Sequence, residues 1–279
     1  MGPPKRIDIK PFMLIVGVVV VGLALVAVFR SEQFAQGIEA QRRQLLAVQA
    51  SGPVDTAALP DLVRTFAERN GGRRGGPKIM VMQQQAEMRL APDQAYFELA
   101  AEQVFATRRP GFVWQARGRM ASVGPVSVVD SYVDGIGILE ARIGGVLTVA
   151  HSAGPETARG EAMRYLAELP FNPDAILNAP DLHWEQVDVD TVAVSLETIG
   201  GLARVLLHFD EAGDVTTASA ADRPRDVDGA TVPTPWLGYF SSYDMIGGYR
   251  LPLTAEVAWQ MPAGEFVYWR GHITAFGGR

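Results

Sequence analysis

The sequence contains no cysteine among its 279 residues. Structural disulfides, thiolate metal sites, iron–sulfur clusters and a cysteine nucleophile are therefore excluded. A surplus of basic residues is also missing, because the formal net charge is -6 and the pI is about 5.3. A nucleic-acid partner would need a local basic patch, and the sequence has none of convincing size. We therefore expect no binding of nucleic acid.

Motifs for metal or cofactor binding are lacking as well. The histidines occur singly, and no two have the i,i+4 spacing that aims two ligands at one metal. They are His151, His183, His208 and His272. The aspartates after residue 187 form no D-x-D-x-D-G loop with a glutamate at its twelfth position, so no calcium loop is predicted. They include Asp188, Asp190, Asp222, Asp226 and Asp228. We expect no metal site and no cofactor.

One long apolar run lies near the N-terminus. Residues 11–29 (PFMLIVGVVVVGLALVAVF) carry no charge. As a helix, the run would extend over roughly 28 Å, close to the thickness of the hydrocarbon core of a bilayer. The alternative is a cleaved signal peptide, which has a shorter apolar stretch and a small-x-small cleavage site, and Leu25-Val26-Ala27 matches such a site poorly. We predict an uncleaved transmembrane anchor over 11–29.

The charges around this run predict its orientation. Lys5, Arg6 and Lys10 precede it, and Arg30 is the only basic residue among the first ten that follow. Basic residues favour the cytoplasmic side, so residues 1–10 are expected to stay in the cytoplasm. The sequence therefore predicts a single-pass membrane protein whose main domain lies outside the cytoplasm.

The rest of the chain divides into a stalk and one domain. Residues 30–56 are compatible with a helical stalk that carries an incomplete apolar stripe. Residues 57–279 are predicted to form a β-rich domain that opens with a short helix. Within this domain, residues 70–78 (NGGRRGGPK) have the composition of a flexible loop.

The β-rich part is recognised by alternation. From residue 79 onward, apolar and polar residues alternate in consecutive segments, which is typical of half-buried strands. Turn sequences such as Asp134-Gly135 and Gly247-Gly248 separate these segments. We predict about ten or eleven strands in an antiparallel sheet, because no helices alternate with the strands.

One helix is predicted to interrupt the strands. Residues 155–169 begin with a proline, carry Glu156 in the first turn and end before Pro170, and residues 173–178 offer a further helical turn or two. The apolar face of this segment needs a place to pack. The predicted fold class is mainly β (α+β), a curved antiparallel sheet or half-barrel with a helix or helical hairpin on its concave side. Such a fold leaves room for an apolar ligand.

Several patches resemble a bacterial domain family of unknown function. They are 101–105 (AEQVF), 110–114 (PGFVW), 130–135 (DSYVDG), 159–168 (RGEAMRYLAE), 233–236 (PTPW) and 268–271 (YWRG). The resemblance covers most of the chain after residue 59, and no functional residue comes with it. The strand pattern of that family is in turn similar to the periplasmic lipoprotein carriers LolA and LolB. This resemblance implies an open half-barrel around a hydrophobic cavity. The predicted anchor, in a chain that resembles a bacterial family, indicates a protein of the bacterial inner membrane.

Candidate ligand contacts follow from this fold. Aromatic rings line both protein cores and apolar pockets, and the sequence cannot separate the two roles. The candidate cavity wall comprises Trp114, Tyr132, Tyr165, Trp184 and Trp259. Glu161 and Arg164 on the predicted helix are candidate contacts for a polar head group, and the alternative for Arg164 is an i,i+4 ion pair with Glu168 on a wet surface.

These observations favour a membrane-anchored, extracytoplasmic binding protein that holds a lipid or other apolar molecule. The alternative is an envelope interaction module whose edge strand or loops recognise another protein. A third hypothesis is a serine hydrolase that uses Ser152, since residues 150–154 (AHSAG) are a variant of the nucleophile elbow. The antiparallel segments downstream oppose it, because that motif requires strand–helix crossover units. We do not expect an enzyme.

Overall fold

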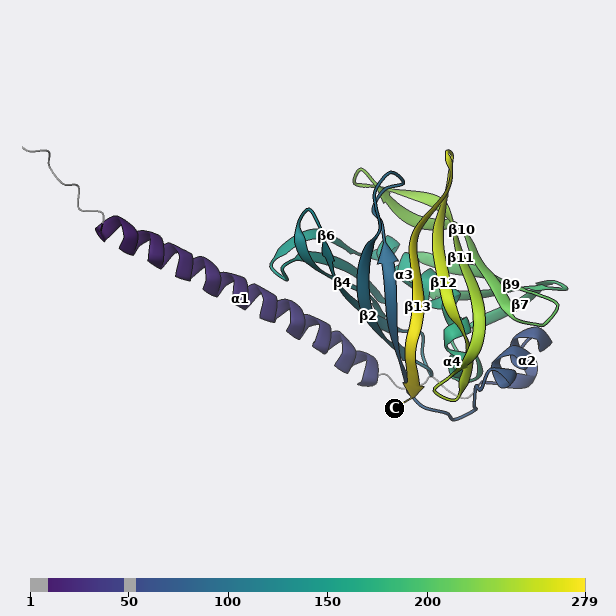
Figure 1. Cartoon of the computed structure of the whole chain (residues 1–279). Helices are drawn as coiled ribbons and strands as arrows, with labels where there is room; N and C mark the ends of the chain where they lie inside the picture. The colour runs from purple at the N-terminus through teal and green to yellow at the C-terminus, as the bar shows by residue number, and fades with distance from the viewer. Residues whose placement is uncertain (1–9, 48–53, 279) are drawn as a thin grey trace, which may run out of the picture.

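This computed structural model describes the backbone of residues 10–47 and 54–278, with side chains from residue 21 onward. The described part contains one 13-stranded antiparallel sheet with helices on both of its faces (Figure 1). Its strand order is β6-β5-β4-β3-β2-β1-β13-β12-β11-β10-β9-β8-β7, so each strand pairs with a neighbour in sequence except where β1 meets β13.

The elements have the following bounds. The strands are β1 (Ile79–Met88), β2 (Phe97–Ala106), β3 (Phe112–Met120), β4 (Gly124–Val133), β5 (Ile136–Ile143), β6 (Leu147–Ala153), β7 (His183–Asp188), β8 (Thr191–Thr198), β9 (Gly201–Phe209), β10 (Val215–Val227), β11 (Ala230–Ile246), β12 (Tyr249–Met261) and β13 (Gly264–Gly278). The helices are α1 (Lys10–Ala47), α2 (Asp61–Arg69), α3 (Pro155–Ala167) and α4 (Pro173–Asn178), with 3-10 turns η1 (Thr56–Ala58) and η2 (Leu169–Phe171).

The predicted antiparallel, mainly β fold is confirmed, but the predicted strand count of ten or eleven is too low. The edge strands β6 and β7 explain part of the difference. All residues of β6 are exposed, and β7 is exposed except for the half-buried Trp184. A strand with both faces in water has no reason to alternate apolar and polar residues, so its sequence gives a weak signal.

Alternation separates the two faces of the sheet. On β1, the even-numbered residues from Met80 to Ala86 are buried on the inner face, whereas Gln83 and Gln85 on the outer face are exposed. The paired residues of neighbouring strands share these faces, so Gln103 and Trp114 also point inward. The main core therefore lies on the inner face.

Helix α3 lies on the concave side of the sheet. It contacts β4, β5 and β6 near one edge and β8, β9 and β10 near the other, which requires the sheet to curve around it (Figure 1). The backbone of its first turn lies very close to glycines near both edges of the sheet. A Cβ at Gly137 would lie 2.6 Å from the Ala158 Cα, and one at Gly200 would lie 2.1 Å from the Pro155 carbonyl oxygen. Glycine is therefore required at both contacts.

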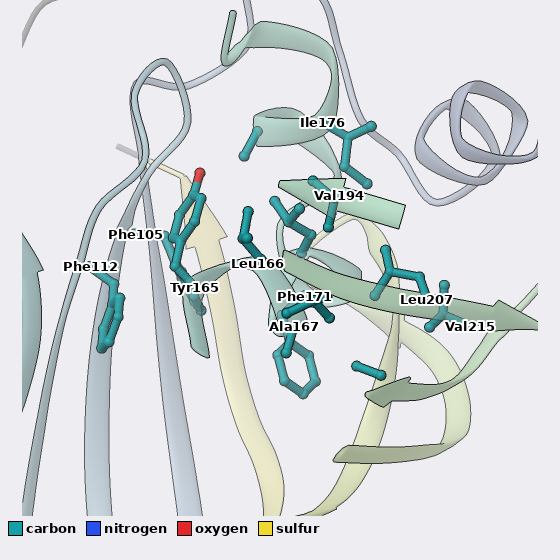
Figure 2. Close-up of a cluster of buried hydrophobic side chains, with 14 of the residues drawn as sticks. Phe105, Phe112, Tyr165, Leu166, Ala167, Phe171, Ile176, Val194, Leu207 and Val215 are labelled. Atoms are coloured by element: carbon teal, nitrogen blue, oxygen red, sulfur yellow. The ribbon is translucent and has the colours of Figure 1, made fainter. Parts of the chain in front are cut away.

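Apolar side chains fill the space between α3 and the sheet (Figure 2). Leu166 from α3 and Phe171 from η2 pack with strand residues such as Phe105 and Leu207, and all four are at most 3% exposed. Side chains packed this closely leave few voids larger than a water molecule among them. An apolar ligand therefore has to bind where α3 does not cover the inner face.

Helix α1 packs on the outer face. Phe34, Ile38 and Leu45 are buried against outer-face residues of β1 to β4, which form a second, smaller apolar cluster. These strand residues are Ile79, Val104, Ala106, Val113, Val129 and Val133. The Arg42 guanidinium donates to the Glu102 carboxylate at 2.9 Å beside this cluster. Residues 30–47 of the predicted stalk thus form the second half of one continuous helix that is docked on the sheet, whereas residues 48–53 lie outside the described part.

The first half of α1 projects away from the domain (Figure 1). Val21, Leu23, Leu25, Val28 and Phe29 are more than half exposed. Among the residues described with side chains, no helix has an apolar stretch long enough to cross a membrane. The predicted anchor falls partly on residues 11–20, whose side chains lie outside the described part, so it stays a prediction.

The two ends of the sheet differ. At one end, α2, η2 and α4 cover the inner face, and we call this the closed end. The loop at 70–78 belongs to it: Arg73 N and Gly75 N donate to Asp174 Oδ1 (2.8 Å) and Asn178 Oδ1 (2.7 Å) on α4. The opposite end carries the β1–β2, β3–β4, β5–β6 and β12–β13 turns, and we call it the mouth end.

Candidate ligand-binding site

A buried network of charged side chains lies between α3 and the sheet. The Arg164 guanidinium donates to Asp130 Oδ2 at 2.5 Å, to Glu168 Oε1 at 2.9 Å and to Gln103 Oε1 at 3.3 Å. It also lies 4.9 Å from the ring centroid of Trp114. Burial lowers the pKa of Arg164, but the surrounding carboxylates raise it above its ordinary value, so this arginine stays charged.

Glu161 and Arg223 extend this network toward the mouth end. The Glu161 carboxylate lies 3.7 Å from the Arg223 guanidinium, and both side chains are at most 9% exposed. Burial raises the pKa of Glu161 to about 8, assisted by the charge of Asp130 and opposed by Arg223 and Arg164. Burial likewise raises the pKa of Asp130, against the lowering effect of Arg164 and Arg223. At neutral pH, Glu161 is therefore largely protonated.

Three atoms of this network are buried without a hydrogen-bond partner among the described residues. They are Asp130 Oδ1, Glu161 Oε2 and Arg223 Nε. A buried polar atom without a partner costs roughly 1–3 kcal/mol, and more when it is charged. The network can therefore accept further polar contacts from a bound molecule or from water.

Between this network and the mouth end, the inner face of the sheet is apolar and is only partly covered by other side chains. Five half-buried side chains lie at the mouth end of β1, β2, β12 and β13, strands with which α3 makes no substantial contact. They are Met88, Phe97, Trp259, Tyr268 and Trp269, and we call them the mouth wall. The register places Met88 opposite both Phe97 and Trp269, so these three share the inner face.

A β-bulge adds one aromatic ring to the mouth wall. The pairing of β12 with β13 shifts between Val257 and Ala258, which leaves Tyr268 as an extra residue. Its ring stacks on Trp259 with centroids 6.0 Å apart, and its hydroxyl accepts a hydrogen bond from Trp236 Nε1 at 3.1 Å. Tyr268 and Trp269 therefore both contribute to the same face although they are adjacent in sequence.

Two arginines border the mouth wall on β10. The Arg223 guanidinium lies 4.5 Å from the ring centroid of Trp236 and 5.6 Å from that of Trp259, and the Arg225 guanidinium lies 5.7 Å from Trp259. Guanidinium groups held over rings keep their edges available for carboxylate, phosphate or sulfate oxygens. The site thus combines an apolar face with cationic groups at its border.

The five residues predicted to form the cavity wall lie in different parts of the domain. Trp114 is 1% exposed, lies under Arg164 and donates from Nε1 to Gln84 Oε1 at 2.9 Å. Tyr132 and Tyr165 are also buried, and the hydroxyl of Tyr165 has no described hydrogen-bond partner. Trp184 lies on the edge strand β7. Of the five, Trp259 alone belongs to the mouth wall, and ligand contact by the others stays a prediction.

The predicted polar contacts lie together. Glu161 and Arg164 both enter the buried network, and the expected ion pair of Arg164 with Glu168 also forms, but with side chains only 14% and 17% exposed. Sequence reasoning missed Asp130, Arg223, Tyr268 and Trp269. Their alternation was visible, but their meeting depends on long-range pairing and on a bulge.

Two hollows are lined by residues outside the mouth wall. A groove of about 420 Å³ at the closed end is lined by residues that include Leu45, Arg109, Tyr132, Asp181 and His183. A hollow of about 290 Å³ lies mainly on the outer face, near the irregularity in β10 where the register shifts between Ala220 and Arg223.

The surroundings of Ser152 do not support the hydrolase hypothesis. Ser152 lies on β6, and its hydroxyl hydrogen-bonds with that of Thr157 at 2.6 Å. His151, its neighbour, has its ring 4.0 Å from Glu140 on the opposite face of the strand. Among the described residues, no group of three or more histidine, aspartate or glutamate side chains could hold a metal ion.

Comparisons with solved structures find proteins of similar architecture. A LolA superfamily protein from Nitrosomonas europaea is 12% identical with a TM-score of 0.41, covering 78% of this chain and 93% of that one. A putative outer membrane lipoprotein-sorting protein domain from Vibrio parahaemolyticus is 9% identical with a TM-score of 0.43, covering 80% and 92%. A DUF1329 family protein from Desulfovibrio piger is 10% identical with a TM-score of 0.42, covering 78% and 90%.

The expected distant resemblance to LolA proteins is thus found, and similarity of this size assigns no ligand to this chain. No curated protein matches the sequence. A family model matches residues 50–271, which include nearly the whole β-rich domain and confirm the expected family of unknown function. The chain belongs to the family of unknown function DUF6544.

Proposed function

We propose that the domain binds a lipid or another amphipathic molecule with an acyl chain on the mouth wall, and that residues 11–29 anchor it in a bacterial inner membrane. The observation that carries the proposal is the half-covered apolar face formed by Met88, Phe97, Trp259, Tyr268 and Trp269. Elsewhere on the inner face, α2, α3, η2 and α4 bury most of the large apolar side chains, although a few, such as Tyr243 and Leu253, are also only partly buried.

The chemistry of the border favours a ligand with an anionic head group. Arg223 and Arg225 stand beside Trp259, and Arg223 Nε is buried without a partner. An acyl chain on the rings would place a phosphate or carboxylate within reach of both guanidinium groups. When Glu161 is protonated near neutral pH, it does not neutralise the positive charge of Arg223, so that charge is available to an anionic head group.

The anchor is supported by the exposed part of α1. Apolar side chains face outward all around the helix from Val21 to Phe29, and a helix that is apolar on every side is stable when lipid surrounds it. Basic residues before the run favour a cytoplasmic N-terminus, which would place the domain on the outer side of the membrane.

Photo-crosslinking tests this function in the full chain. The protein is reconstituted in nanodiscs that contain a phospholipid with a diazirine on its acyl chain, irradiated and digested, and the crosslinked peptides are identified by mass spectrometry. We expect crosslinks in Tyr249–Met261 and Gly264–Gly278 as well as in the anchor. The double variant Trp259→Ala/Trp269→Ala should lower the yield in these strands at least threefold.

Trp184→Ala is the matched control, because it removes a half-buried tryptophan from the edge strand β7. Its yield in β12 and β13 should equal that of the parent. Crosslinks confined to α1 in the parent protein would contradict ligand binding on the mouth wall.

The alternative, an envelope interaction module, is favoured by one observation. Both edges of the sheet are open, and β7 presents unpaired backbone groups beside the exposed Val187 and Val189. A strand of another protein could pair there. Absence of lipid crosslinks, together with crosslinking of β7 to an envelope protein in cells, would move the assignment to this alternative.

A further inference from the structure

The direction of α1 along the sheet can be read from its contacts at both ends. At the mouth end, Arg142 donates from Nη1 to the Arg30 carbonyl at 3.2 Å, and a Cβ at Gly145 would lie 2.8 Å from Ser31 Oγ. At the closed end, a Cβ at Gly111 would lie 2.7 Å from Leu45 Cδ1. The docked part of α1 therefore runs from the mouth end to the closed end.

This direction places the apolar part of α1 at the mouth end. Residue 29 ends the uncharged run. Directly after it, Arg30 contacts Arg142 near the end of β5, and Ser31 lies next to Gly145 in the β5–β6 turn. The helix is continuous through this point, so its apolar first half leaves the domain beside the mouth end and not beside the closed end. Figure 1 shows this half extending past the β4–β6 side of the sheet.

The turns at this corner form one surface. Met120 pairs with Gly124 across the β3–β4 turn, Ile143 pairs with Leu147 across the β5–β6 turn, and the Gly144 N–H donates to the Pro125 carbonyl at 2.8 Å. The two turns are therefore adjacent, and both neighbour the point where α1 leaves the domain.

The side chains of this surface are apolar and basic. Val123 is 43% exposed and Leu147 is 59% exposed at the two turns. Arg117 and Arg119 lie on β3 next to them, are exposed, and pair with no described carboxylate. We call Arg117, Arg119, Val123 and Leu147 the rim. Apolar tips flanked by arginines suit the interface of a membrane that contains anionic lipids.

We propose that the rim lies on the bilayer into which α1 inserts, so that the mouth wall opens toward the membrane surface and exchanges its ligand directly with the outer leaflet. This rests on the proposed function, because it requires the anchor. The rim then contacts an anionic lipid surface. Two observations favour this partner: the rim lies beside the point where the apolar part of α1 leaves the domain, and the rim is positively charged although the formal net charge of the chain is -6.

Single-cysteine labelling tests the proposal directly, because the chain has no native cysteine. Val123→Cys and Leu147→Cys are labelled with an environment-sensitive fluorophore in the full chain, reconstituted in proteoliposomes of phosphatidylcholine with 30% phosphatidylglycerol. Lipids that carry a nitroxide near the head group are then added as quenchers. We expect quenching at both positions at least three times that at a control label.

Val189→Cys is the control, since Val189 is 85% exposed in the β7–β8 turn, away from the mouth end. Equal quenching at Val123, Leu147 and Val189 in vesicles that carry the protein would overturn the proposal. The outcome is separable from failure of the anchor: without an anchor, the chain would not float with the vesicles at all.

The arginines supply a second readout. Arg117→Gln/Arg119→Gln should lower the quenching at Leu147→Cys at least twofold in vesicles with phosphatidylglycerol. The same variant should have little effect in vesicles of pure phosphatidylcholine, since only the anionic surface attracts the guanidinium groups. A label at Leu147 that is quenched equally with and without the arginines would refute their role in the rim.

Discussion

The most discriminating prediction concerns the stability of Glu161→Gln as a function of pH. Glu161 is buried, its carboxylate lies 3.7 Å from the Arg223 guanidinium, and burial raises its pKa from 4.5 to about 8. In the unfolded chain the carboxyl ionises near pH 4.5, whereas in the folded chain it keeps its proton up to about pH 8. The folded state therefore binds more protons than the unfolded state between these values.

The sign of the effect follows from this difference. A folded-state pKa above the unfolded value contributes stability that is fully present below pH 4.5 and is lost as the pH rises to about 8. Each pKa unit corresponds to about 1.4 kcal/mol, so the loss is at most about 5 kcal/mol and is smaller if water reaches the ionised group. Glutamine has nearly the same shape and no charge at any pH, so the variant lacks this loss.

Urea unfolding of the full chain in detergent micelles at pH 5, 6.5 and 8.5 measures the effect. The free energy of unfolding of the parent should fall relative to that of Glu161→Gln by several kcal/mol from pH 5 to pH 8.5. Taking the difference between the two proteins removes the contribution of groups unaffected by the substitution. Glu197→Gln, on the exposed side of β8, should stay parallel to the parent. Parallel curves for Glu161→Gln would refute the raised pKa.

Three further substitutions test the packing of the helices, each by thermal or urea unfolding. Ile38→Ala should lower the free energy of unfolding by about 2–4 kcal/mol, because Ile38 is 2% exposed between α1 and the outer face; no loss would mean that α1 is not docked. Gly137→Ala should cost about 1–3 kcal/mol, because its Cβ would lie 2.6 Å from the Ala158 Cα. Gly37→Ala, where a Cβ meets nothing within 4 Å on an exposed face of α1, should instead stabilise the chain by up to about 1 kcal/mol, and an equal loss for both glycines would contradict the contact at Gly137.

The fold class could be predicted because its signal is local. On β1, the alternation of buried Met80 and Met82 with the outward side chains between them shows the strand and its inner face from a few neighbouring residues. The same holds for α3, whose proline at the first helical position and Pro170 after its end fixed the helix within two residues.

The outer-face helix was less predictable for a physical reason. The apolar stripe of Phe34, Ile38 and Leu45 was visible, but a stripe does not name the surface that covers it. That surface consists of outward-facing valines on several strands, such as Val104 and Val129, which only the register brings together. The sequence therefore indicated that this part of α1 packs against another surface, but it did not indicate that this surface is the outer face of the sheet.

The candidate site was predicted only in its helical part. Glu161 and Arg164 stand three residues apart on α3 and could be named from sequence, whereas Asp130 and Arg223 approach them from opposite halves of the sheet. Tyr268 and Trp269 are adjacent, and alternation would place them on opposite faces, so only the bulge brings both rings to the mouth wall. Long-range pairing and local irregularity thus account for what was missed.

The asymmetry between the two ends of the sheet separates a binding face from a core. Both ends carry aromatic rings on the inner face, but at the closed end the covering elements contact them. The ring centroids of Phe240 and Phe171 of η2 lie 5.4 Å apart, and those of Tyr243 and Phe66 of α2 lie 6.4 Å apart. At the mouth end, by contrast, Trp259 and Trp269 are only half-buried. Exposed apolar area of this kind opposes solubility unless a ligand or a membrane covers it. The apolar half of α1 leaves the domain at the same end, so one bilayer can cover both.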